Sequence, residues 1–215
     1  MAWAAPQASG SPRTHQNACR ACSRWYRTCR AHRRARAWQN AAASVASLDV
    51  VVEEGASAQV LVCFDAPEAG EGAIGSTLGV FADADAHVDI QTVHAASDGF
   101  TTMDDTALFL DDGARITVRH TVLGAGKSFV GLAGNLSGKR SDVHVTTRYV
   151  GHGEEALDFN YLLRHRGEKT TCLMDAQGVL IDECTKILRG TIDWHAAARA
   201  RKAPKPNRSS SPTSA

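Results

Sequence analysis

Hydrophobic and polar residues alternate along much of the chain between residues 48 and 194. Alternation with a period of two turns one face of a strand toward a core and the other face toward solvent. The pattern is clear in residues 87–91 and recurs in residues 114–119, 143–149 and 157–161. Gly, Asp and Asn gather at the breaks, where turns require them. The alternation predicts a series of short β-strands and no helix in this part of the chain.

The strand centres recur at regular intervals. Their positions are Val88, Ile116, Val143, Leu157, Thr171 and Ile187. The separations are 28, 27, 14, 14 and 16 residues, so two strands make up a turn of about 28 residues. Such a repeat predicts a solenoid of stacked coils, and it favours this fold over a β-sandwich, which also has short alternating strands. In residues 170–192 the inward face is left open, because Thr171 and Leu173 or Cys172 and Met174 could point toward the core.

Charge divides the chain into three regions, although its formal net charge is only +1. Residues 1–47 contain eight Arg and residues 195–215 contain five Lys or Arg, and neither region has an acidic residue. Residues 48–194 therefore hold 11 basic and 23 acidic residues, a net charge of −12. We predict a basic head that is helical or disordered, an all-β core and a basic disordered tail, in that order. No run of about 18 apolar residues is present, so no membrane span is expected.

The basic head contains a candidate zinc site. Cys19, Cys22, Cys29 and His32 follow the spacing C-x2-C-x6-C-x2-H and could close a tetrahedral site. The spacer is shorter than the dozen or more residues found in common zinc modules. The same cysteines also fit the apolar stripe of a basic amphipathic helix. An acid-free start rich in Arg and Ala is in addition typical of an organelle transit peptide, and these interpretations are left open.

The last 40 residues of the core contain three motifs in a fixed order. They are His165-x-Gly167-x-x-Thr170, the turn Gly178-Val179-Leu180, and the strand Arg189-Gly190-Thr191-Ile192. This segment resembles the SufB/SufD family of iron–sulfur cluster assembly proteins. The upstream segment GNLSGKRSDVHV is similar to a Gly- and Asp-rich coil corner of the same family. The resemblance extends over about residues 48–194.

The resemblance implies a right-handed parallel β-helix, which is a single-stranded solenoid. It also implies a non-enzymatic subunit of an iron–sulfur cluster assembly scaffold of the SufBCD type. The partners would be SufB-like and SufC-like subunits, the latter an ATPase, or a second SufD-like chain in a homodimer. No intrinsic cofactor is expected, and an iron–sulfur cluster would be held only transiently, within the complex.

Two departures from the family pattern concern the branch and the length of the chain. In SufB-like proteins a cysteine proposed to take part in cluster assembly lies in a strand that matches residues 107–118. This chain has Phe109 and no Cys in that strand, which favours the SufD-like branch. Family sequences also continue beyond the strand that ends at Ile192, with further coils and a helical domain that contacts the ATPase. We therefore expect a truncated member of the family.

Few residues of the core are candidates for chemistry. His165, Cys172 and Cys184 are the candidate cluster ligands, because imidazole and thiolate suit iron, although a buried Cys is also a common core residue. The segment GAGKS at residues 124–128 lacks the Gly that a phosphate loop needs at position 121, which is Thr121. We predict no catalytic centre.

Two other functions are weighed against the assembly hypothesis. A β-helix enzyme acting on polysaccharides would use acidic residues such as Asp89, Asp111 and Asp112, for which the sequence shows no pairing. A solenoid binding module would contact nucleic acid or an anionic surface through its basic ends, but nucleic acid and membranes are not the expected partners.

The six scattered cysteines do not form a dense disulfide pattern. They predict a cytoplasmic protein, or a plastid protein if residues 1–47 are a transit peptide.

Overall fold

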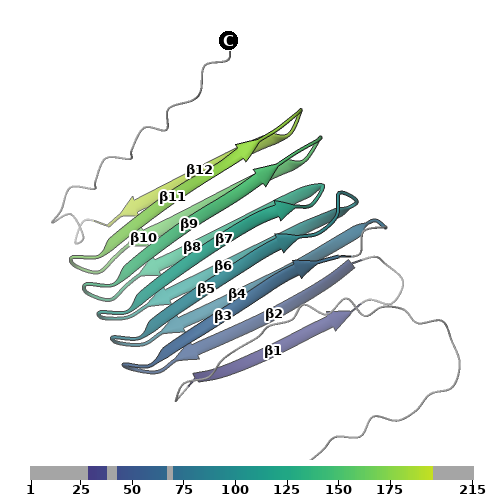
Figure 1. The fold of residues 1–215 in the computed structure, drawn as a ribbon. Coiled ribbons are helices and arrows are strands. Elements are labelled where there is room, and N and C mark those ends of the chain that lie inside the picture. The colour runs from purple at the N-terminus through teal and green to yellow at the C-terminus, as the bar shows by residue number, and fades with distance from the viewer. Residues whose placement is uncertain (1–28, 38–42, 67–69, 196–215) are drawn as a thin grey trace, which may run out of the picture.

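The structure, a computed structural model, describes residues 29–37, 43–66 and 70–195, and all regular elements in them are β-strands (Figure 1). The strands are β1 (Cys29–Ala37), β2 (Ala43–Val52), β3 (Ser57–Asp65), β4 (Gly72–Ala82), β5 (His87–Ala95), β6 (Phe100–Leu110), β7 (Arg115–Gly124), β8 (Lys127–Leu136), β9 (Asp142–Gly151), β10 (Ala156–His165), β11 (Thr171–Leu180) and β12 (Thr185–Trp194). These ranges contain no helix that is long and apolar enough to cross a membrane. The prediction of an all-β core is confirmed.

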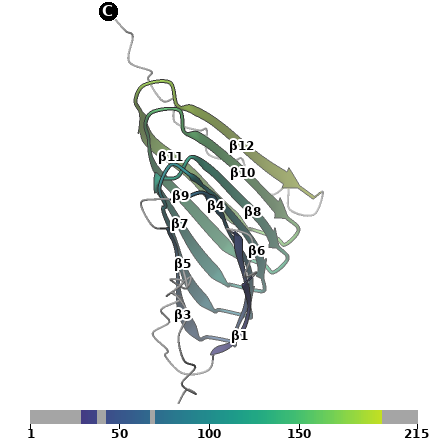
Figure 2. The same ribbon diagram turned by 90° about the vertical axis from the view of Figure 1, so that its right-hand side faces the viewer.

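The strands form two sheets that face each other (Figure 2). Sheet A has the order β1-β2-β4-β6-β8-β10-β12, and sheet B has the order β11-β9-β7-β5-β3. All pairings are parallel except that of β1 with β2, which is antiparallel. The chain thus alternates between the sheets and builds a β-solenoid of about 5 turns. The predicted parallel β-helix is confirmed.

Equivalent residues of successive coils stack in register. Val88 pairs with Ile116, and Ile116 pairs with Val143. All three side chains are buried between the sheets. The predicted repeat of about 28 residues is therefore the length of one coil, and each coil places one apolar side chain in this column of the core.

The register also settles which face of residues 170–192 is turned inward. Cys172 pairs with the buried Val143, and Cys172 and Met174 pack against the hydrophobic core. Thr171 and Ile187 were predicted to be strand centres equivalent to Val88, but they pair with Asp142 and Asp158 and are exposed, Ile187 to 51%. That prediction was wrong by one position, and a shift of one residue moves a side chain to the other face of a sheet.

The turns from sheet A to sheet B share one backbone feature. Each has a residue with φ between 55° and 69°, and these residues are Gly55, Asp85, Gly113, Arg140 and Lys169. The first four donate their N–H to a carbonyl of the next corner at 2.7–2.9 Å, namely those of Ala84, Asp112, Lys139 and Glu168. Gly accepts a positive φ without strain and Asp is enriched there. The clusters of Gly and Asp at the breaks therefore mark stacked corners.

The β-structure begins before the predicted boundary at residue 48. Residues 29–37 form β1, and β2 begins at Ala43. Both segments were assigned to a helical or disordered head, and the structure corrects this for the residues that it describes. Helical and strand patterns are hard to separate in a short segment rich in Ala and Arg. The pairing of β1 with the edge of β2 is a long-range contact that local pattern does not reveal. Residues 1–28 and 196–215 lie outside the described residues.

Polar side chains occupy the middle of the core. Asp104 Oδ2 lies 3.7 Å from His94 Nε2 and 3.6 Å from His120 Nδ1, and all three side chains are fully buried. His120 Nδ1 contacts Thr92 Oγ1 at 2.7 Å, and His94 Nδ1 contacts Thr102 Oγ1 at 2.8 Å. Burial alone would raise the pKa of Asp104, but His120 and His94 outweigh burial and hold that pKa well below its usual range. Burial lowers the pKa of His94.

Replacement of Gly138 by Ala should test how closely the corners stack. An added Cβ would overlap the backbone of Asp111 and Asp112 in the preceding coil, so the corner would have to move. We expect Gly138→Ala to lower the free energy of unfolding by about 2–3 kcal/mol, as measured by urea denaturation. Gly75→Ala is the control, because its added Cβ meets its nearest neighbour, Val45, at an ordinary 3.6 Å. Equal effects of the two substitutions would contradict the stacked corners.

The buried His94 should make the protein sensitive to mild acid. Because its pKa is lowered by folding, the unfolded chain takes up a proton below pH ~6.5 that the folded chain does not. The free energy of unfolding should therefore fall as the pH decreases from 7.5 to 5, by at most about 1.4 kcal/mol per pH unit for this group. His94→Gln should reduce this slope in pH-dependent urea titrations. A parent protein whose stability rises toward pH 5 would contradict the burial of a neutral His94.

Candidate functional site

The predicted ligands His165 and Cys172 meet at a corner where the chain passes from sheet A to sheet B. His165 Nε2 lies 3.2 Å from Cys172 Sγ. On the other side of the ring, Nδ1 lies 2.7 Å from Thr170 Oγ1, and that hydroxyl donates to the carbonyl of Gly167. The Nδ1–H of His165 therefore donates to Thr170, and Nε2 accepts the thiol proton. Trp194 stacks on the imidazole with ring centroids 4.0 Å apart.

Both members of this pair are neutral near pH 7. Burial lowers the pKa of His165. Burial, with a smaller contribution from the Asp142 carboxylate, raises the pKa of Cys172 to about 11. Since the thiolate and not the thiol binds metals, Cys172 must lose its proton before it can bind iron. The two side chains are therefore placed close enough to bind one metal ion, but Cys172 carries the thiol proton that metal binding has to remove.

Cys184 does not join this pair. It directly precedes β12, whose first residue, Thr185, pairs with Ala156, whereas His165 pairs with Trp194 at the far end of the same strands. Nine residues of extended strand separate the two ends, which corresponds to about 30 Å. The structure therefore brings together two of the three predicted cluster ligands.

The candidate zinc site falls largely outside the described residues. Cys29 and His32 lie in β1, and both pair through their backbone with β2. Cys19 and Cys22 precede the described part of the chain. The zinc hypothesis therefore stays a prediction.

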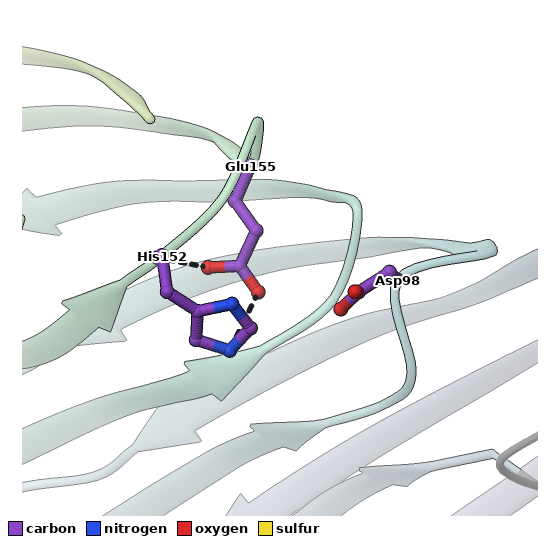
Figure 3. Close-up of side chains that lie close together, drawn as sticks. All are labelled: Asp98, His152 and Glu155. Carbon is purple, nitrogen blue, oxygen red and sulfur yellow. Dashed lines mark hydrogen bonds and ion pairs between the residues drawn. The ribbon is translucent and has the colours of Figure 1, made fainter. Parts of the chain in front are cut away.

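A group of three possible metal ligands lies at the other kind of corner, where the chain passes from sheet B to sheet A (Figure 3). Asp98 lies in the β5–β6 turn, and His152 and Glu155 lie in the β9–β10 turn, two coils further along. Each residue offers one ligand atom, and these atoms lie within 4.8 Å of one another. Local sequence gave no indication of this group, because 54 and 57 residues separate its members. Each separation is about two coil lengths, so the repeat of the coil could have indicated that these residues lie on the same edge of the solenoid.

Asp98 and His152 are exposed, whereas Glu155 is only 3% exposed. Glu155 Oε2 accepts the backbone N–H of His152 at 3.0 Å. His152 Nε2 lies 3.4 Å from Glu155 Oε1. The two exposed side chains thus cover a carboxylate that is fixed by its own turn, and they border a hollow of about 580 Å³.

Other residues singled out in the sequence have structural roles. In GAGKS, Gly124 ends β7 and Lys127 begins β8, so the segment is a corner and no helix follows it. Asp89 forms an ion pair with Arg119 at 3.1 Å on the outer face of sheet B. Asp112 accepts the backbone N–H of Lys139 at 2.6 Å in a corner. These acidic residues satisfy local donors on different parts of the coil.

The outer faces of the two sheets differ in character. Sheet A exposes apolar side chains in two clusters: Val45, Met103 and Phe129 around a hollow of about 410 Å³, and Phe81 stacked on Phe109 with centroids 4.8 Å apart. Both sheets carry ion pairs, such as Arg189–Asp158 on sheet A and Arg119–Asp89 on sheet B, and the exposed apolar residues of sheet B are Leu and Val. Exposed clusters of aromatic and Met side chains are typical of protein contact surfaces.

Comparison with known protein families identifies one match. Residues 34–209 match the family described as SUF system FeS cluster assembly, SufBD core domain. A search among curated proteins finds no match. The matched range includes β2–β12, and the parallel β-helix agrees with the fold that the motifs at residues 165–192 imply. The chain therefore belongs to the SufBD core-domain family of iron–sulfur cluster assembly proteins.

Proposed function

We propose that this chain is a non-enzymatic subunit of a SUF-type complex and assists iron–sulfur cluster assembly through contacts with other subunits. The observation that carries the proposal is the match to the SufBD core domain over residues 34–209. Membership of this family implies that the chain acts in a complex with other subunits. The partners that we propose are a SufB-like subunit and a SufC-like ATPase. The SufD-like branch is favoured by Phe109, which stands where SufB-like proteins have a cysteine.

The outer face of sheet A is the surface that best fits a contact with the SufB-like subunit. Phe81, Met103 and Phe109 are 39–52% exposed in strands whose backbones are fully paired within the sheet. Aromatic side chains on a preformed sheet bind a partner with little loss of conformational freedom, and the flexible Met adapts its shape to the partner. Sheet B exposes Leu and Val side chains but no Phe or Met among the described residues.

The iron–sulfur cluster enters this proposal as cargo. His165 and Cys172 supply two adjacent soft donors at one corner, and clusters are commonly held by four ligands. A cluster at this corner would therefore need ligands from a partner subunit as well as deprotonation of Cys172. This arrangement suits transient contact with a cluster within the complex.

Co-expression with a SufB-like and a SufC-like subunit should give a stable complex. We expect the chain to co-elute with both partners in size-exclusion chromatography with light scattering. Met103→Glu and Phe109→Glu should each weaken this association at least about tenfold, because a charge would be buried in an apolar contact.

Leu123→Glu provides the matched control. Leu123 is a similarly exposed apolar residue, 53% exposed, but it lies in β7 of sheet B. We expect it to leave the complex intact. Elution of the parent chain alone would contradict the proposed function. An intact parent complex that resists both sheet A substitutions would instead contradict the assignment of the surface.

A further inference from the structure

The corner that holds Asp98, His152 and Glu155 has an unusually open construction. Between the β5–β6 and β9–β10 turns lies the β7–β8 turn, in which the residues are Ala125 and Gly126. An added Cβ on Gly126 would overlap the carbonyl oxygen of Asp98. Because this middle turn carries only a methyl group and a hydrogen as side chains, groups from the coils on both sides can meet above it (Figure 3).

The carboxylate of Glu155 is held in place but is incompletely satisfied. Oε2 has a short bond, 3.0 Å, from the backbone N–H of His152. The polar contacts of Oε1 among the described residues are both 3.4 Å long, one from the backbone N–H of Ala125 and one to His152 Nε2. A buried carboxylate oxygen normally has a shorter and stronger partner. Oε1 is thus fixed in position, buried and free to take a better ligand.

The distance of 3.4 Å between His152 Nε2 and Glu155 Oε1 suits two ligands of one metal ion. It is long for a hydrogen bond. Two donors bound at about 2.1 Å in a tetrahedral arrangement are separated by about 3.4 Å. An oxygen of the exposed Asp98 carboxylate lies within 4.8 Å of both ligand atoms and offers the third ligand.

The surrounding charge favours a cation. Glu71 and Glu154 line the same hollow as Asp98 and Glu155. Among the described residues that line it, Lys127 alone is a Lys or Arg. Four carboxylates against one ammonium give a negative potential at the entrance. The hollow is open to solvent, so an ion can reach the three donors directly.

We propose that Asp98, His152 and Glu155 bind a divalent transition-metal ion at this corner. One imidazole nitrogen with two carboxylate oxygens suits Zn²⁺, Fe²⁺ or Mn²⁺, whereas Ca²⁺ and Mg²⁺ prefer ligands that are all oxygen. The bound ion joins the β5–β6 turn to the β9–β10 turn and fastens three successive coils together. This proposal does not depend on the proposed assembly function.

Zn²⁺ titration of the full-length chain tests the site. Cys19→Ser and Cys22→Ser are introduced first, so that thiolates of the head do not compete. Isothermal titration calorimetry should show one Zn²⁺ per chain bound more tightly than Mg²⁺, and Zn²⁺ should raise the melting temperature. Asp98→Asn and His152→Gln should each weaken Zn²⁺ binding at least about tenfold and remove the rise in melting temperature. Both side chains are exposed, so these variants should fold, which circular dichroism checks.

His144→Gln is the matched control. His144 lies on the outer face of β9 with Nε2 3.5 Å from Asp142 Oδ2, and the described residues offer this His–Asp pair no third ligand. We expect this variant to bind Zn²⁺ like the parent. The proposal is overturned if the parent binds no Zn²⁺, if it binds Mg²⁺ equally well, or if Asp98→Asn and His152→Gln bind Zn²⁺ as tightly as the parent does.

Discussion

The structure depends on the in-register hydrogen bonding of parallel strands from one coil to the next. Each coil of about 26–30 residues places its backbone groups opposite their equivalents in the neighbouring coil, with one register shift between His94 and Ala95. A shift of one residue would exchange the core and solvent faces of a whole strand. The apolar columns, the stacked corners with positive φ and the meeting of side chains from distant parts of the sequence all follow from this register.

Local pattern predicted much of the fold but less of the candidate site. The spacing of Val88, Ile116 and Val143 identified a true column of the core, because a repeat in sequence becomes a repeat in space when coils stack. The antiparallel β1 was missed, because its pairing adds an edge strand that no repeat records. His165 and Cys172 were found because they flank a single turn, whereas Cys184 lies at the other end of its strand. Asp98 and His152 are two coils apart, beyond the range of any local motif.

The chemistry of the molecule lies at its corners and on one face. The middle of the core holds a buried Asp and two His that pair with each other and with Thr hydroxyls, which makes them part of the scaffold. Both outer faces carry ion pairs and exposed apolar residues, but the exposed Phe and Met side chains of the described residues all lie on sheet A. A subunit of the SufBD core-domain family that works through contacts with other subunits would use such a face. Its corners offer soft donors on one side of the coil and a carboxylate–imidazole group on the other.

A distance measured across the coils tests the register most directly. Gln59, Asp89, Thr117, His144 and Leu173 are successive partners along the outer face of sheet B. Four strand spacings separate the first from the last, so spin labels at Gln59 and Leu173 should have backbone positions about 19 Å apart. Pulsed electron paramagnetic resonance, with the native cysteines replaced, should give a narrow distribution consistent with that separation. A broad distribution, or a separation well above 30 Å, would contradict a β-helix with this register.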